Sequence, residues 1–153
     1  MKVVIALGSN LGDRRGYLDR AIDSLKEHLR IDAISTLIES EPVGGPEQGD
    51  YLNGVLLGDT ELSPEELMSE LLRIESELDR VRSVANAPRT IDLDLIDYEG
   101  MTLSSPLLTL PHPRAHLRHF VITPWFEIDP EGVLVGHGTV SYTHLTLPTN
   151  REV

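Results

Sequence analysis

Two aspartates in the stretch PRTIDLDL (88–95) have the residue type and the spacing of a metal site. Successive side chains of a β-strand point to opposite faces, so Asp92 and Asp94 would share one face and the apolar residues between them the other. Their Cα atoms would lie about 7 Å apart, close enough for both carboxylates to bind one hard cation or to bridge two. Oxygen ligands favour Mg²⁺ or Mn²⁺ over zinc. The alternative is an ordinary amphipathic strand with solvated acids.

Arginines gather on both sides of this aspartate pair. Of the 13 Lys and Arg residues, only Lys2 and Lys26 are lysines. The arginines nearest the pair in sequence are Arg80, Arg82, Arg89, Arg114 and Arg118. Arginine can donate two parallel hydrogen bonds to a phosphate, and a metal ion with several arginines is the usual apparatus of phosphoryl transfer. The alternative is surface salt bridging or, for Arg80 and Arg82, interaction with a helix macrodipole.

Other residues have side chains suited to ligand binding. His112 lies between two prolines in LPHPR (110–114), where a rigid loop favours a phosphate contact over a metal ligand. Tyr51 and Asn53 would share one face of a strand, and an aromatic ring beside an amide can hold a flat heterocycle. Phe120 is a candidate for a second stacking face. The alternative places Phe120 in the core and Tyr51 at a sheet edge.

The elements that must position these residues follow from the apolar pattern. The pattern predicts strands over 2–8, 31–40, 51–59 and 90–98, and helices over 14–30, 63–81 and 115–128. Ser63 and Glu66 have the spacing of a capping box. The order β-α-β-β-α-β predicts an α+β, ferredoxin-like fold, in which helices pack on an antiparallel sheet.

Composition narrows the class of protein. A length of 153 residues fits one domain. The 13 basic and 25 acidic residues give a net charge of −12, which argues against a binder of nucleic acid or membrane surfaces, because both are negatively charged. The absence of cysteine excludes disulfides and thiol catalysis. With neither a signal peptide nor a spanning apolar run apparent, the expected compartment is the cytoplasm.

Five segments, taken in order, resemble the 6-hydroxymethyl-7,8-dihydropterin pyrophosphokinase family of folate biosynthesis. They are ALGSNLGD (6–13), EPVGGPEQGDYLN (41–53), LLRIESELDRVR (71–82), PRTIDLDL (88–95) and LTLPHPRAHLRHFV (108–121). Each is modest alone, but the five in order are highly specific. The resemblance implies a ferredoxin-like, monomeric transferase with mobile loops. Such an enzyme moves diphosphate from ATP to the hydroxymethyl group of a pterin, releases AMP and uses two Mg²⁺ ions.

The resemblance also implies residue roles. Asp92 and Asp94 would bind both Mg²⁺ ions, and Arg80 and Arg89 would contact the transferring phosphates. The nucleotide contacts would be Glu75, Arg82, Thr109, His112 and Arg118. The pterin pocket would consist of Ser40, Val43, Tyr51, Asn53 and Phe120. The sequence departs from the family pattern in two places. Asp79 stands where a glycine is common. The loop 83–87 is one residue shorter than in some relatives, and it has Asn86-Ala87 where Trp-Gly or a similar pair often stands, which puts a stacking contact from it in doubt.

The last fifteen residues, TVSYTHLTLPTNREV (139–153), have a different resemblance. Residues 140–149 match one translated frame of a transposase mosaic-end adapter of the kind used to prepare sequencing libraries. We therefore expect a pyrophosphokinase domain over 1–139 that is truncated at its C-terminus. The remainder, 140–153, would be a non-native tail without function.

Two other function classes remain open from the residues alone. One is a different Mg²⁺-dependent nucleotidyl- or phosphotransferase on the same fold. The other is a non-catalytic module that binds a nucleotide without turning it over. Pterin binding tests the first alternative, and AMP release from ATP with and without pterin tests the second. All three interpretations expect small-molecule ligands, with neither nucleic acid nor membrane as partner.

Overall fold

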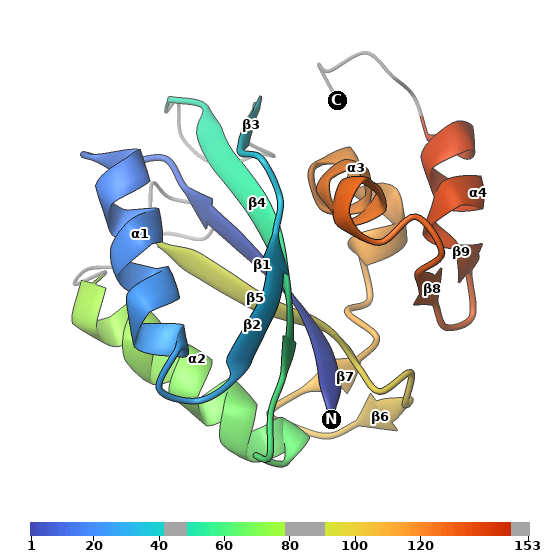
Figure 1. Cartoon of the computed structure of the whole chain (residues 1–153), viewed down its shortest axis with the longest axis horizontal. Helices are drawn as coiled ribbons and strands as arrows, with labels where there is room; N and C mark the ends of the chain where they lie inside the picture. Colours follow the sequence, from blue (N-terminus) through green and yellow to red (C-terminus); the bar gives the residue numbers. More distant parts are fainter. Residues whose placement is uncertain (42–48, 79–90, 148–153) are drawn as a thin grey trace.

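The centre of the molecule is an antiparallel sheet in the order β2-β4-β1-β5, with β3 also paired to β4 (Figure 1). The structure is a computed structural model that describes residues 1–41, 49–78 and 91–147. The strands are β1 (Lys2–Ser9), β2 (Arg30–Ile34), β3 (Ile38–Ser40), β4 (Tyr51–Asp59) and β5 (Asp92–Tyr98). Helices α1 (Arg14–Leu25) and α2 (Pro64–Leu78) connect them. The predicted ferredoxin-like, α+β fold is confirmed.

Helices α1 and α2 cover one face of the sheet and enclose the larger core (Figure 1). The capping box at the start of α2 is formed as predicted. The Ser63 amide donates to Glu66 Oε1 at 2.9 Å, and the Glu66 amide donates to Ser63 Oγ at 3.1 Å. The largest fully buried side chains of this core include Ile5, Leu18, Leu25, Leu56, Leu67, Leu71 and Ile74. Their burial fixes both helices against the sheet.

Two predicted elements in the first third of the chain differ from those observed. The helix expected over 14–30 ends at Leu25, where the amide of His28 bonds to the Leu25 carbonyl and tightens the chain out of the helix. The strand expected over 31–40 is divided into β2 and β3. Between them the Ser35 amide donates to the Val55 carbonyl at 2.9 Å, but the Val55 amide donates to the Ser35 hydroxyl, also at 2.9 Å. A side chain therefore takes the place of one backbone acceptor at this point.

A third helix, which the β-α-β-β-α-β pattern does not include, covers the other face of the sheet (Figure 1). The helix expected over 115–128 is divided, because Arg118 is extended. It comprises a 3₁₀ turn (Ala115–Leu117) and α3 (His119–Ile128). Trp125 of α3 is 1 % exposed and lies in this second core. Two short strand pairs lie outside the main sheet, β6 (Leu103–Ser104) with β7 (Thr109–Leu110) and β8 (Val133–Leu134) with β9 (Gly138–Thr139). Within the described ranges, no helix has the length and apolarity needed to cross a membrane.

Strand β5 contains a bulge. Its pairing with β1 shifts from Ile5↔Leu95 to Val4↔Asp97, so β5 carries one extra residue, Ile96. Ile96 packs in the second core, and Asp97 lines a cavity on the same side of the sheet. The bulge therefore turns two consecutive side chains toward α3.

The segment after Thr139 folds as helix α4 (Val140–Thr146) beside α3. Val140 is fully buried, and the rings of Phe126 and His144 stack with their centroids 4.9 Å apart. This packing does not test the expectation that residues 140–153 are a non-native tail.

Candidate active site

Three strands bring the predicted ligand-binding residues to one end of the sheet. Gly8 of β1 is paired with Asn53 of β4 on one side and with Asp92 of β5 on the other. Because Gly8 has no side chain, the space between these two residues stays open. A Cβ atom at Gly8 would lie 3.2 Å from Asn53 Oδ1 and 3.4 Å from Tyr51 Cδ1. The sheet thus places the predicted heterocycle contacts and the predicted metal ligands on opposite sides of a glycine.

The predicted alternation around the aspartate pair is confirmed. Ile91 and Leu93 are 0 % and 1 % exposed in the α1–α2 core, whereas Asp92 and Asp94 are half-buried on the opposite face. Both aspartates line a narrow cleft of about 20 Å³, which Gly8, Asn53 and Phe120 also line. The carboxylates therefore open toward the residues predicted to hold a heterocycle.

Glu75 fixes the backbone between the two aspartates from the side of the sheet that α2 covers. Its carboxylate is 5 % exposed and accepts the Leu93 amide at 2.6 Å, in the same strand segment as Asp92 and Asp94. Sequence analysis assigned Glu75 only a nucleotide contact. A sign of this second role was present, because Glu75 follows the core residue Leu71 by four positions and so lies on the buried stripe of α2.

A histidine and an arginine approach Asp94 from the segment that leads into α3. The His112 amide donates to the Ile96 carbonyl at 3.0 Å, which holds the histidine against β5. His112 Nε2 lies 3.9 Å from Asp94 Oδ1, and Arg118 Nη1 lies 3.8 Å from Asp94 Oδ2. Burial, reinforced by the Arg118 charge, lowers the pKa of His112 to about 4. The imidazole is therefore neutral at pH 7 and forms no ion pair with Asp94.

The predicted heterocycle pocket contains a buried hydrogen bond. Asn53 Nδ2 donates to Ser40 Oγ at 2.7 Å, and the two residues are only 4 % and 5 % exposed. Such a bond holds the amide in one orientation, because a buried polar group without a partner is costly. Phe120 is half-buried. It packs against the second core and lines the cleft, with the Arg118 guanidinium 5.6 Å from its ring centroid.

Several predicted site residues are not placed near the cleft. Arg80, Arg82, Arg89 and Val43 lie outside the described residues. Thr109 is exposed on β7. The predictions for these five positions stay predictions.

The donor set fits Mg²⁺ only when a substrate shares the ion. In the described part of the chain no three His, Cys, Asp or Glu residues gather as a metal site. Mg²⁺ is commonly bound by one or two carboxylates together with water and substrate phosphates. Asp92 and Asp94 match that arrangement, in which a bound triphosphate would supply the remaining oxygens.

Comparison with known proteins assigns the chain to a class of transferases. The family model for 7,8-dihydro-6-hydroxymethylpterin-pyrophosphokinase (HPPK) matches residues 4–130. The chain belongs to this family and is a pyrophosphokinase of folate biosynthesis. The resemblance seen in the sequence is thereby confirmed.

Named relatives agree with this assignment. The chain is 41% identical over 128 residues to 2-amino-4-hydroxy-6-hydroxymethyldihydropteridine pyrophosphokinase of Aquifex aeolicus, a match that covers 84% of this chain and 80% of the relative. It is 40% identical over 126 residues to the Bacillus subtilis protein of the same name, covering 81% and 75%. A crystal structure of Plasmodium falciparum HPPK-DHPS matches with a TM-score of 0.77 at 13% identity, covering 94% of this chain and 45% of that one. That likeness shows the fold alone, and this chain spans less than half of that protein.

Proposed function

We propose that the protein transfers the terminal diphosphate of ATP to the hydroxymethyl group of 6-hydroxymethyl-7,8-dihydropterin in a Mg²⁺-dependent reaction. The products are AMP and the pterin diphosphate. The observation that carries the proposal is the row Asn53–Gly8–Asp92 across three adjacent strands. This row supports a reaction in which a heterocycle and a metal-bound phosphate meet in one cleft.

In this reaction the hydroxymethyl oxygen attacks the β-phosphorus of ATP in line. The bond from that phosphorus to the oxygen bridging to the α-phosphate breaks, and AMP leaves. Asp92 and Asp94 would hold Mg²⁺, which would supply positive charge to neutralise and orient the triphosphate. Asp92, which is paired with Gly8, is the carboxylate best placed to accept a hydrogen bond from the attacking hydroxyl. No other protein base is required, because the proton can pass to solvent.

The cationic residues stabilise the charge that develops on the phosphates. Arg80 and Arg89 contact the transferring groups, and Arg82 binds nearby. Arg118, next to Asp94, and the neutral His112 contact the nucleotide. The other two proposed nucleotide contacts are Glu75 and Thr109.

The pterin is held at the opposite side of Gly8. Asn53, oriented by Ser40, forms hydrogen bonds to the edge of the ring. Tyr51 and Phe120 provide apolar ring surface, and Val43 completes the pocket. A neutral, polar heterocycle suits this half of the cleft, because its described lining combines the Asn53 amide with the Phe120 ring.

The remaining expectations are part of the same proposal. We place the enzyme in the cytoplasm as a monomer that acts on small molecules. Its domain spans 1–139, and residues 140–153 derive from an adapter. Re-amplification of the locus from its source tests this boundary. A native reading frame that still encodes SYTHLTLPT would contradict it.

AMP release from ATP, measured with and without the pterin, tests the function. We expect AMP to form only when ATP, Mg²⁺ and the pterin are all present. Equal AMP release without the pterin would indicate a different acceptor. Tight nucleotide binding without any AMP would indicate a non-catalytic module.

A further inference from the structure

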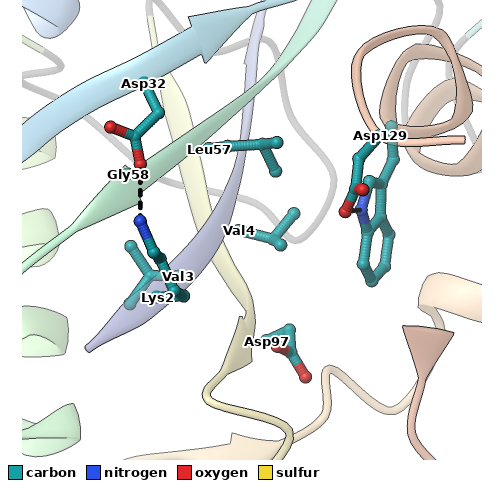
Figure 2. Close-up of a pocket in the computed structure, with 9 residues that line it drawn as sticks. Lys2, Val3, Val4, Asp32, Leu57, Gly58, Asp97 and Asp129 are labelled. Atoms are coloured by element: carbon teal, nitrogen blue, oxygen red, sulfur yellow. Dashed lines mark hydrogen bonds and ion pairs between the residues drawn. The ribbon is translucent and has the colours of Figure 1, made fainter. Parts of the chain in front are cut away.

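A second cavity lies at the other end of β1, on the face of the sheet that α3 covers (Figure 2). Its volume is about 270 Å³. Residues Lys2 to Val4 of β1 line it, whereas Ala6 to Gly8 line the active-site cleft. The two cavities have no lining residue in common, and at about 3.3 Å per residue the middles of the two lined segments, Val3 and Leu7, are roughly 13 Å apart. The second cavity is therefore separate from the proposed reaction site.

A buried carboxylate lines this cavity without a full set of partners. Asp97 is only 9 % exposed. Its Oδ2 accepts the Gly100 amide at 3.2 Å, but within the described residues its Oδ1 has no hydrogen-bond partner. Burial raises the pKa of the Asp97 carboxyl, and the nearby Glu99 adds to the shift. A carboxylate in this position is costly to ionise unless a cation or a hydrogen-bond donor reaches it.

A second carboxylate, Asp129, lines the same cavity from the end of α3. Its Oδ2 accepts the indole N–H of Trp125 at 3.1 Å. A glycine permits this contact, because a Cβ atom at Gly132 would lie 2.5 Å from Asp129 Oδ2 and 2.7 Å from Trp125 Nε1. Figure 2 shows Asp97 and Asp129 on different sides of the space that Val4 and Leu57 also line.

Lys2 is the basic residue among those that line this cavity, and its ammonium group is already paired with carboxylates. The Lys2 ammonium lies 3.3 Å from Asp32 Oδ2 (Figure 2). It also lies 3.3 Å from Asp59 Oδ2. Asp32, which also lines the cavity, has a second cation in Arg30, whose Nε lies 2.9 Å from Asp32 Oδ1. Lys2 therefore compensates the negative charge of Asp32 and Asp59. In the part of the chain that the structure describes, Asp97 has no ion pair with Lys2.

We propose that this cavity is a second binding site, for a small organic cation with a primary ammonium group on a short alkyl chain. The ammonium group would donate hydrogen bonds to Asp97, and Asp129 would add favourable charge. The alkyl chain would contact the apolar surface of Val4, Leu57 and Trp125. The volume lies just below the range of about 300–1,000 Å³ that is typical of drug-sized ligands, so it suits a compound of few heavy atoms.

Titration of the protein with n-butylammonium chloride at constant ionic strength tests this site. The chain has one tryptophan, so the indole N–H of Trp125 gives a single NMR resonance next to the cavity. We expect saturable shifts of this resonance. Asp97→Asn should weaken binding by about tenfold or more, because it removes the charge but keeps the size of the side chain. Asp129→Asn should also weaken it.

Three controls make the test decisive. Asp23→Asn makes the same change on α1, where the side chain is 76% exposed and lies outside this cavity, and should bind the probe as the wild type does. 1-Butanol, which has a similar shape but no charge, should bind about tenfold more weakly or not at all. Equal binding of butanol, or unchanged binding to Asp97→Asn, would overturn the proposal. An affinity for n-butylammonium about tenfold higher in Lys2→Met than in the wild type would also overturn the proposal, because Lys2 itself would then be the occupant of the site.

Discussion

The carboxylates at the two ends of β5 lie in different environments. Asp92 and Asp94 are half-buried beside a cleft, and His112 and Arg118 approach Asp94 within 4 Å. Asp97, three residues further along, is nine-tenths buried with one oxygen that has no partner among the described residues. Aspartates of a single strand therefore lie in two different electrostatic environments. One suits a metal-bound substrate, and the other imposes a cost on the folded protein.

The backbone produces this difference. Regular alternation would direct Asp97 into the α1–α2 core with Ile91, Leu93 and Leu95. The bulge at Ile96 instead turns Asp97 toward α3 and returns Tyr98 to the α1–α2 core. At the other end of the strand, the Glu75 carboxylate holds the Leu93 amide and keeps the alternation regular. A single extra residue thus separates the end of β5 that carries the proposed metal ligands from its buried end.

Substitutions of the aspartates should separate the two ends most clearly. Asp92→Asn and Asp94→Asn should each lower turnover by several orders of magnitude, because each removes a charged metal ligand while the buried face of β5 is unchanged. Asp97→Asn makes the same change on the same strand and should leave turnover near that of the wild type. The measurement is the steady-state rate with circular dichroism as a check of folding. Near-normal Mg²⁺-dependent rates in both ligand variants would refute the metal assignment.

The arginines should have the next largest effect. Arg80→Ala and Arg89→Ala should each lower single-turnover rates by roughly 100-fold or more, as loss of a transition-state contact does. The affinity for a non-hydrolysable ATP analogue should fall much less. Lysine at either position should restore only part of the rate, because it lacks the planar pair of donors. An equal fall in rate and in analogue affinity would make these arginines simple ATP anchors.

Asn53→Ala should show whether the pterin and ATP bind to different parts of the cleft. It removes the amide and leaves Ser40 Oγ without this donor. Loss of a buried hydrogen-bond partner costs about 1–3 kcal/mol, so pterin affinity should fall about 5- to 150-fold. ATP-analogue affinity, measured in the same way, should change little. Equal losses for both ligands would assign Asn53 a structural role.

The free-energy cost of ionising the buried Asp97 should make the stability of the protein depend on pH. Because burial raises its folded-state pKa above 3.8, the folded protein binds this proton more tightly than the unfolded chain. Stability is therefore highest below the unfolded-state pKa and falls as pH rises through the folded-state pKa. Asp97→Asn should increase the free energy of unfolding at pH 7 by about 1–3 kcal/mol. Denaturant titrations of both proteins at pH 3 and pH 7 should show this gain at pH 7 only.

A gain in Asp97→Asn of the same size at pH 3 would contradict the electrostatic explanation. In that case the substitution would act through packing.

Much of the fold could be predicted because local and global signals agree. The strand over 51–59 has the same limits in the sequence prediction and in the structure. The capping box at Ser63 and the alternation at Asp92 and Asp94 were also correct, since each depends on residues close together in the chain.

Features that depend on distant contacts could not be predicted in this way. The bulge at Ile96 arises from pairing between β1 and β5, and the position of α3 depends on how the second core closes. The sequence pattern placed Gly8 only at the end of the predicted strand 2–8. Its role became visible only when β4 and β5 were placed on either side of it.

The fate of labelled phosphate in a single turnover tests the central claim most directly. With ATP labelled at the α-phosphate in one sample and at the γ-phosphate in another, we expect the α label in AMP and the γ label in the pterin product. Both products should form in equal amounts, and only with Mg²⁺ present. An α label in ADP would show transfer of a single phosphate, and an α label on the pterin would show nucleotidyl transfer. Either result would contradict diphosphate transfer in the cleft between Asn53 and Asp92.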